Sequence, residues 1–151
     1  MVQEPEKVLV LCTGNSCRSV MAEALINQLG QGRYKAWSAG SSPAGYVHPK
    51  TIETLKQHGI DPGAPRSKSW DVFANEAFDL VITVCDQAAG ESCPLFPGKP
   101  KKLHWSIPDP AKATGTEAEI NAAFDEAFSM LKDRIEDLIN DPPFTPTPVL
   151  S

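Results

Sequence analysis

Two continuous apolar runs constrain the fold of this chain more than any other feature. They are KVLVLC at residues 7–12 and FDLVITVC at residues 78–85. A strand with one solvated face alternates apolar and polar residues, whereas a run that is apolar throughout is typical of a parallel strand covered on both faces. Both runs have the length of a strand and are far too short to span a bilayer. They predict the interior of a parallel sheet.

Helix-like and strand-like segments alternate around these two runs. The predicted order is strand 7–12, helix 17–29, strand 34–40, helix 48–59, strand 78–85, strand 101–106 and a long last helix. Such alternation is typical of parallel strands joined by right-handed helical crossovers. The sequence therefore predicts an α/β fold of three layers, α/β/α, in which helices on both faces cover a four-stranded parallel sheet.

The last helix has the clearest start signal. Thr116 and Glu119 have the spacing of a capping box. An apolar stripe at helical spacing then predicts a core-facing helix. The stripe consists of Ile120, Phe124, Ala127, Leu131, Ile135 and Leu138. No linker or repeat divides the chain, so we expect one domain over residues 1–141 and a flexible, proline-rich tail over residues 142–151.

The net charge of the chain restricts the classes of molecule that it can bind. The formal net charge is −5, which argues against nucleic acid or an anionic membrane as a partner, because both require a basic surface. The first residues, MVQEPEK, lack the apolar segment of a signal peptide. We therefore expect a cytoplasmic protein without a membrane partner, in which a local site holds any anionic substrate.

The four cysteines, Cys12, Cys17, Cys85 and Cys93, lack the C-x2-C spacing of zinc knuckles. A disulfide scaffold is also not expected in a reducing compartment. Two explanations for these cysteines remain: burial in the core or chemical reactivity. We expect Cys17 to be buried, whereas Cys12 and Cys85 each end a predicted strand. Ligands of parallel sheets bind beyond the carboxyl ends of the strands, so the positions of Cys12 and Cys85 favour a catalytic role for this pair.

The loop CTGNSCRS, residues 12–19, joins the first strand to the first helix. A loop of small residues that leads into a helix directs several backbone N–H groups at one point, where an oxyanion binds. Arg18 adds a planar fork for two oxygens. The same environment favours the thiolate of Cys12, a nucleophile for a phosphorus or arsenic centre. Neither a Walker A motif nor a G-x-G-x-x-G motif is present.

The stretch VLVLCTGNSCRSVMAEAL resembles the opening of the low-molecular-weight protein tyrosine phosphatase superfamily, whose phosphate loop is C-x5-R-[ST]. The resemblance extends over residues 6–140, and within the superfamily it is strongest to the arsenate reductases. It implies that Cys12 is the nucleophile, Arg18 the oxyanion clamp and Asp109 the general acid. It also implies that Ser19 hydrogen-bonds the thiolate and that Asn15 holds the loop. The oxyanion cradle would then consist of Thr13, Gly14, Asn15, Ser16, Cys17, Arg18 and Ser19.

A reductase needs further thiols, whereas a phosphatase needs only water. The resemblance implies that Cys85 attacks Cys12 and that Cys93 then attacks Cys85, which leaves a disulfide between residues 85 and 93. Thioredoxin is the favoured reductant, with glutaredoxin or a small thiol as alternatives. Arsenate would be the substrate, and phosphate or sulfate its analogue. The residues after Asp109-Pro110 are Ala111, Lys112 and Ala113, where the related phosphatases have aromatics that stack on the substrate ring.

Three further hypotheses stay open. The first is a phosphatase for phosphotyrosine or a small ester, with Asp109 as general acid. The second is a redox or oxyanion sensor that uses the disulfide between Cys85 and Cys93. The third is a potassium ion near the loop, because Asn15, Glu23 and Ser38 match three ligand positions of some relatives. No other cofactor is expected.

Overall fold

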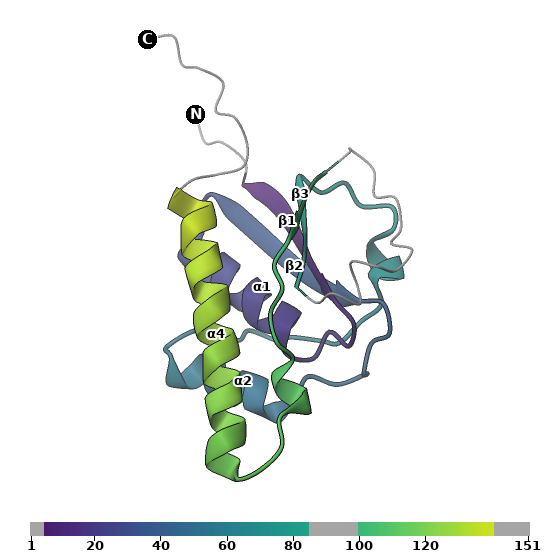
Figure 1. The fold of residues 1–151 in the computed structure, drawn as a ribbon. Coiled ribbons are helices and arrows are strands. Elements are labelled where there is room, and N and C mark those ends of the chain that lie inside the picture. The colour runs from purple at the N-terminus through teal and green to yellow at the C-terminus, as the bar shows by residue number, and fades with distance from the viewer. Residues whose placement is uncertain (1–4, 85–99, 141–151) are drawn as a thin grey trace.

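In the part of the chain that the structure describes, four parallel strands and three α-helices form the fold (Figure 1). The structure, a computed structural model, describes residues 5–84 and 100–140. Its elements are β1 (Glu6–Cys12), α1 (Arg18–Leu29), β2 (Tyr34–Gly40), α2 (Pro49–Gln57), η1 (Trp70–Phe73), β3 (Leu80–Thr83), β4 (Lys101–His104), η2 (Pro110–Lys112) and α4 (Glu117–Asn140), where η denotes a 3₁₀ helix.

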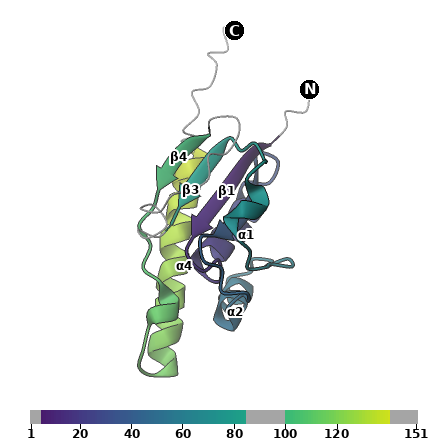
Figure 2. The ribbon, with the colours of Figure 1, turned by 90° about the vertical axis from the view of Figure 1, so that its right-hand side faces the viewer.

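The strand order is β2-β1-β3-β4, and every neighbouring pair is parallel. Figure 2 shows β1, β3 and β4 side by side. β1 is an inner strand and is buried from Val8 onward. Its last residue, Cys12, lies opposite Gly40, the last residue of β2. The carboxyl ends of these strands therefore form one edge of the sheet, where Cys12 lies.

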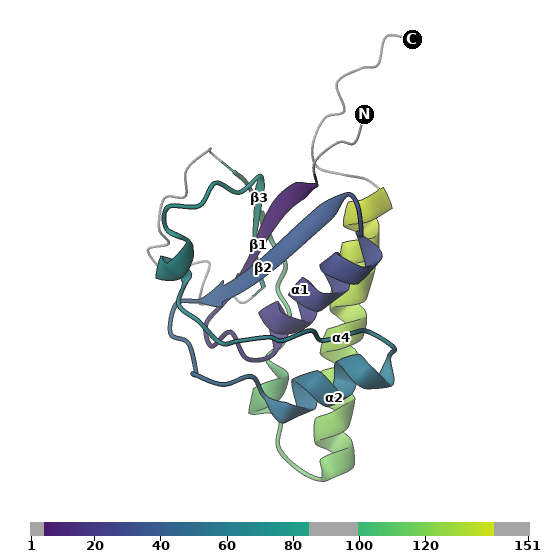
Figure 3. The ribbon, with the colours of Figure 1, turned by 180° about the vertical axis from the view of Figure 1, so that it is seen from behind.

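The two faces of the sheet have different cores. Val8, Val10, Leu80 and Ile82 pack with α1 and α4, so a pair of helices buries one face. The opposite face packs against η1 and its surroundings, with Trp37 at the edge. That second core consists of Leu9, Leu11, Ala39, Trp70, Phe73, Phe78 and Val81. Figures 1 and 3 show the strands between the three α-helices on one side and the short teal η1 on the other.

The predicted four-stranded parallel sheet is confirmed, and the predicted elements lie within a few residues of those observed. Helices on both faces are also observed: within the described ranges, α1 and α4 pack on one face and the 3₁₀ helix η1 packs on the other. Its four residues, WDVF, are too few for a helical periodicity. The burial of Trp70 and Phe73 holds this segment against the sheet, and no sequence periodicity marks it as a helix.

The capping box predicted for α4 forms as expected. The Glu119 N–H donates to the Thr116 hydroxyl at 3.1 Å, and the Thr116 N–H donates to the Glu119 carboxylate at 3.4 Å. Of the predicted stripe, five side chains are buried and Ile120 is partly buried. None of the helices described in residues 5–84 and 100–140 is long and apolar enough to cross a membrane. The predicted tail, residues 142–151, lies outside the described residues.

Candidate active site

Cys12 lies at the point where β1 ends and the loop turns towards α1. It is 2% exposed, and two groups of the loop contact its sulfur. The Ser19 Oγ lies 2.9 Å from the Cys12 Sγ, and the Asn15 N–H donates to the same sulfur at 3.2 Å. The loop therefore wraps around Cys12 and places polar groups of Asn15 and Ser19 against its sulfur.

Asn15 holds the loop in this shape. Its φ of 48° is left-handed, a conformation that asparagine tolerates better than most residues. The Asn15 Nδ2 donates to the Ser19 hydroxyl at 2.8 Å and to the Ser38 hydroxyl at 2.9 Å. The Asn15 Oδ1 accepts from the Lys68 N–H at 2.9 Å. These bonds connect the loop to β2 and to the segment before η1, and they offset the backbone strain.

A second layer of contacts supports the loop from behind. The Ser42 N–H donates to the Thr13 carbonyl at 2.9 Å, and the Thr51 hydroxyl donates to the Ser16 carbonyl at 2.8 Å. A Cβ on Gly40 would clash with the Thr13 carbonyl oxygen. Only glycine therefore lets the end of β2 pack this closely against the loop.

Arg18 and Asp109 face each other across the mouth of the loop. The Arg18 Nη1 donates to the Ile107 carbonyl at 3.0 Å, and the Arg18 Nη2 lies 3.5 Å from the Asp109 Oδ2. The other Asp109 oxygen accepts the Ala111 N–H at 3.0 Å and so caps η2. The structure thus brings the predicted clamp and the predicted acid to one place, although 91 residues of sequence separate them.

A pocket of about 210 Å³ opens above the Cys12 sulfur. It is lined by Cys12, Thr13, Gly14, Ser16, Cys17, Arg18, Asp109 and Lys112. This volume is below the usual range of sites for drug-sized ligands, about 300–1,000 Å³, and suits a small oxyanion. Asn15 and Ser19, by contrast, act from beneath the pocket through the contacts to sulfur.

Cys17 differs from Cys12 in its surroundings. It is 3% exposed, as predicted, and directly precedes α1. Burial raises the pKa of the Cys17 thiol, and hydrogen bonds to Thr51 and Ser16 oppose this only in part. A thiol whose neutral form is favoured is a poor nucleophile near neutral pH. Although both cysteines line the pocket, the environment therefore favours Cys12 for chemistry.

The three residues proposed for potassium lie together behind the loop. Ser38 joins them, because it accepts from Asn15 and donates to the Glu23 carboxylate at 3.1 Å. Burial raises the pKa of Glu23, and the nearby Lys68 ammonium lowers it in part. Lys68 already supplies a positive charge near Glu23, and its backbone N–H donates to the Asn15 side-chain Oδ1. These residues therefore do not fit a bound potassium ion.

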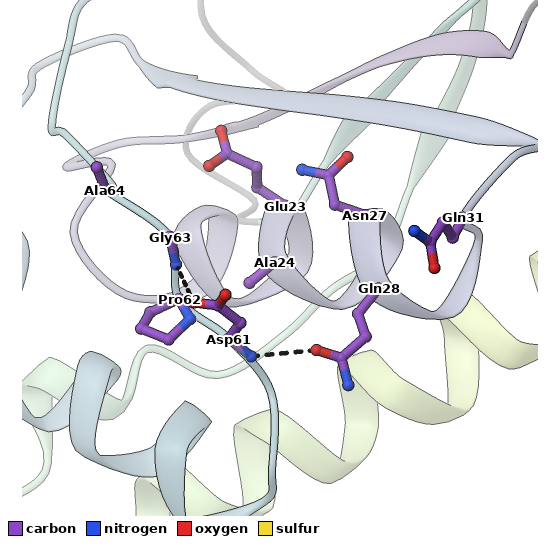
Figure 4. Close-up of a pocket in the computed structure, with 9 residues that line it drawn as sticks. All are labelled: Glu23, Ala24, Asn27, Gln28, Gln31, Asp61, Pro62, Gly63 and Ala64. Carbon is purple, nitrogen blue, oxygen red and sulfur yellow. Dashed lines mark hydrogen bonds between the residues drawn. The ribbon is translucent and has the colours of Figure 1, made fainter.

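A larger cavity of about 600 Å³ lies along α1, away from Cys12. Figure 4 shows side chains of successive turns of α1 beside the segment of residues 61–64. Its walls are Glu23, Ala24, Asn27, Gln28, Gln31, Asp61, Pro62, Gly63 and Ala64. Several of these groups pair with each other, such as the Asp61 N–H with the Gln28 Oε1 at 3.1 Å. The cavity contains no nucleophilic sulfur among these described residues, so the smaller pocket is the candidate active site.

Two of the predicted site residues, Cys85 and Cys93, lie outside the described residues. Sequence reasoning assigned no site role to four residues that shape or line the site: Gly40, Lys68, Ile107 and Lys112. Gly40 ends the SAG segment and had a weak signal as a small residue at a strand end. Lys68 and Ile107 act through backbone groups, for which the sequence carries no signal.

A phosphate loop at the end of the first strand of a parallel sheet, with an arginine and an aspartate at its mouth, defines a class of cysteine-dependent enzymes that act on oxyanions. The model of one family, the low molecular weight phosphotyrosine protein phosphatases, matches residues 7–142. The chain belongs to this family. The resemblance predicted over residues 6–140 is thereby confirmed.

Within the family, the chain is similar to arsenate reductases. The arsenate reductase of Bacillus subtilis (strain 168) is 37% identical over 134 residues, which cover 89% of this chain and 95% of the relative. A solved arsenate reductase in its phosphate-binding state superposes with a TM-score of 0.72 at 29% identity, over 89% of this chain and 97% of its own.

A third relative is a thioredoxin-dependent enzyme. The thioredoxin-dependent arsenate reductase of Corynebacterium glutamicum superposes with a TM-score of 0.62 at 29% identity, over 90% of this chain and 64% of its own. The predicted resemblance to the reductase branch of the superfamily is therefore confirmed by sequence and by structure.

Proposed function

We propose that this protein reduces arsenate to arsenite. The observation that carries the proposal is the Cys12 sulfur at the floor of a small pocket with Arg18 and Asp109 at its mouth. The high similarity to arsenate reductases over most of the chain supports arsenate as the oxyanion. The small pocket volume agrees with an inorganic substrate.

In the first step, the Cys12 thiolate attacks arsenic and a sulfur–arsenic bond forms. An oxygen leaves arsenic as water, and Asp109 supplies a proton for it as general acid. The Arg18 guanidinium takes two of the remaining oxygens, because its planar fork matches an oxyanion. The distance of 3.5 Å between the Arg18 Nη2 and the Asp109 Oδ2 supports these roles, since both side chains line the pocket of Cys12.

In the second step, the Cys85 thiolate attacks the Cys12 sulfur. The sulfur–arsenic bond breaks and its electron pair stays on arsenic, which leaves as arsenite, while a disulfide joins the two cysteines. The Cys93 thiolate then attacks the Cys85 sulfur and frees Cys12. One backbone contact supports the assignment of Cys85 as the thiol that attacks Cys12: Val84, which precedes Cys85 in the chain, donates its N–H to the carbonyl of Leu11, which precedes Cys12, at 2.9 Å.

A dithiol must finally reduce the disulfide between Cys85 and Cys93. We assign this step to thioredoxin, and the thioredoxin-dependent reductase of Corynebacterium glutamicum among the structural neighbours supports the choice. Glutaredoxin or a small thiol is the alternative reductant. Because the cycle needs free thiols, we place it in the reducing cytoplasm.

Hydrolysis of phosphate esters is a second candidate activity. Membership of a phosphatase family and the shared positions of Cys12, Arg18 and Asp109 favour it. Water would then hydrolyse a cysteinyl-phosphate, with no need for further thiols. The absence of aromatic residues directly after Asp109-Pro110 argues that aryl phosphates bind weakly.

The two activities can be separated in one experiment. NADPH consumption is measured with thioredoxin and thioredoxin reductase, with and without arsenate, beside hydrolysis of p-nitrophenyl phosphate. We expect arsenate-dependent NADPH consumption that is fast relative to ester hydrolysis, and Cys12→Ser should abolish both. Rapid ester hydrolysis without arsenate-dependent NADPH consumption would contradict the proposal. Replacement of thioredoxin by glutaredoxin or glutathione identifies the reductant.

A further inference from the structure

Lys112 lines the pocket of Cys12, although sequence reasoning gave it no role beyond being non-aromatic. It ends η2, the short helix that begins directly after Asp109. The pocket residues therefore include two cationic side chains, Arg18 from α1 and Lys112 from η2, which approach the mouth from different parts of the chain.

The position of Lys112 is fixed by the backbone of η2. The Lys112 N–H donates to the Asp109 carbonyl at 3.2 Å, and the Ala113 N–H donates to the Pro110 carbonyl at 3.1 Å. The Asp109 side chain caps the same turn through Ala111. Lys112 is thus held at a fixed spacing from the proposed general acid. Its side chain remains exposed and free to follow a ligand.

The other charged groups of the pocket do not by themselves attract an anion, so a second cation has a role to fill there. Arg18 and Asp109 form an ion pair at 3.5 Å, so the carboxylate balances much of the arginine charge. A thiolate at Cys12 adds a negative charge, and the whole chain carries −5. Without Lys112, the pocket would be net negative while Asp109 is ionised and neutral once Asp109 is protonated as the proposed general acid, so in neither state would it attract an arsenate dianion. Among the described residues, no carboxylate lies within ion-pair distance of the Lys112 ammonium.

We propose that Lys112 is a specificity-determining residue that attracts a small inorganic dianion into the pocket of Cys12. A lysine ammonium carries its charge at neutral pH and is a compact, strongly hydrated point charge. It favours a freely charged oxyanion, and it offers no flat apolar surface to an aryl ester. This role rests on the proposed function for its substrate, arsenate, but the attraction of anions to Cys12 is independent of turnover.

The attraction is measured without turnover through alkylation of Cys12. Iodoacetate is an anion and iodoacetamide is neutral, so the ratio of their rates at Cys12, followed by site-resolved mass spectrometry, reports the local field. We expect Lys112→Gln to lower this ratio about fivefold at low ionic strength, with the difference decreasing at high salt. Lys132→Gln, at an exposed lysine of α4, removes the same net charge and should leave the ratio unchanged. Equal ratios in the two variants would overturn the proposal.

Kinetics test the role in specificity. Lys112→Gln should raise the KM for arsenate about fivefold with little change in kcat, and Lys112→Arg should restore most of the loss. Lys112→Tyr should raise kcat/KM for p-nitrophenyl phosphate relative to arsenate. A fall in kcat at unchanged KM would assign Lys112 a structural role and overturn the proposal. If the native enzyme shows no arsenate-dependent turnover, the proposed function fails, and the alkylation ratio still decides on Lys112.

Discussion

At the scale of single residues, Ser19 has two tasks beneath the pocket. Its hydroxyl contacts the Cys12 sulfur at 2.9 Å and also accepts from the Asn15 amide at 2.8 Å. A hydroxyl that accepts from an amide has its own proton available, so Ser19 is set to donate to sulfur. Asn15 therefore acts on Cys12 both directly, through its N–H, and through the orientation of Ser19.

We predict that Ser19→Ala lowers kcat for arsenate about tenfold to hundredfold. A hydrogen bond to a charged group contributes about 1.5–3 kcal/mol, and each 1.36 kcal/mol is roughly a factor of ten in rate. Steady-state kinetics with thioredoxin measure the change. Ser129→Ala, at an exposed position of α4, is the matched control and should behave as the native chain. A Ser19→Ala enzyme with native kcat would show that the thiolate does not need this contact.

Gly40 gives a second test at this scale. In Gly40→Ala, the new Cβ would clash with the Thr13 carbonyl oxygen and would lie 3.1 Å from Asn15. Because the nearest neighbour is a backbone atom, the loop itself must shift. We predict a loss of about 1–3 kcal/mol in the free energy of unfolding. We also predict at least a roughly tenfold loss of kcat/KM for arsenate, since misplacement by about 1 Å is costly in catalysis.

Gly32→Ala separates these two effects. Gly32 has a φ of 87°, and a Cβ at this position would meet no heavy atom within 4 Å. Alanine there strains the backbone by about 1 kcal/mol without contacting the loop. Both variants should thus unfold at lower urea concentration, but only Gly40→Ala should lose activity. Equal activity per folded molecule in the two variants would contradict the proposed dependence of the loop on Gly40.

At the scale of elements, the sequence predicted what local rules determine. Continuous apolar runs marked β1 and β3, and the Thr116–Glu119 spacing marked the start of α4, because each signal lies within one element. The contacts that complete the site are long-range. The bond from Lys68 to Asn15 spans 53 residues, and the bond from Arg18 to Ile107 spans 89. No spacing rule reaches such pairs, so only the fold reveals them.

The packing of α1 against the segment before η1 predicts a pH dependence of stability. Burial raises the pKa of Glu23 above its ordinary value of 4.5, and Lys68, itself near Arg66, opposes this shift. The folded state therefore binds the Glu23 proton more tightly than the unfolded state does. The stability that Glu23 contributes is fully present below about pH 4.5 and is lost as the pH rises through its raised pKa.

Glu23→Gln removes this titration. The free energy of unfolding, measured in urea between about pH 4 and 6.5, should decrease with rising pH more steeply in the native chain than in Glu23→Gln. The native-minus-variant difference therefore falls with rising pH. Glu126→Gln, at an exposed carboxyl on α4, controls for the loss of one negative charge. A native-minus-variant difference that is constant or rises with pH would show that Glu23 is not destabilised by burial.

At the scale of the whole molecule, the fold brings together groups that the chain keeps apart. Cys12 ends β1, Arg18 begins α1 and Asp109 precedes η2, yet all three line one pocket at one edge of the sheet. The oxyanion chemistry follows from these three. In the proposed mechanism, the outcome of the chemistry, reduction or hydrolysis, depends instead on Cys85 and Cys93, which follow β3 in the chain.

The cysteines can be tested one at a time. We predict that Cys85→Ser forms the arsenic adduct on Cys12 but releases no arsenite, because no thiol displaces arsenic. Cys93→Ser should release about one arsenite per enzyme and then stop. Without the Cys93 thiolate, no group of the enzyme attacks the disulfide between Cys12 and Cys85, so Cys12 is not freed. Both variants should keep any ester hydrolysis, which needs only Cys12. Arsenite released in a single mixing experiment, counted per enzyme, distinguishes these outcomes.

Cys17→Ala is the control for the loss of a thiol near the pocket. Its thiol is buried and its pKa is raised by that burial, so it has no part in the relay and the variant should complete many turnovers. Normal turnover of Cys93→Ser with thioredoxin would contradict the three-thiol relay and favour a small thiol that attacks Cys12 directly. In that case Cys85→Ser should also turn over, since neither downstream cysteine would then be needed to move the two electrons.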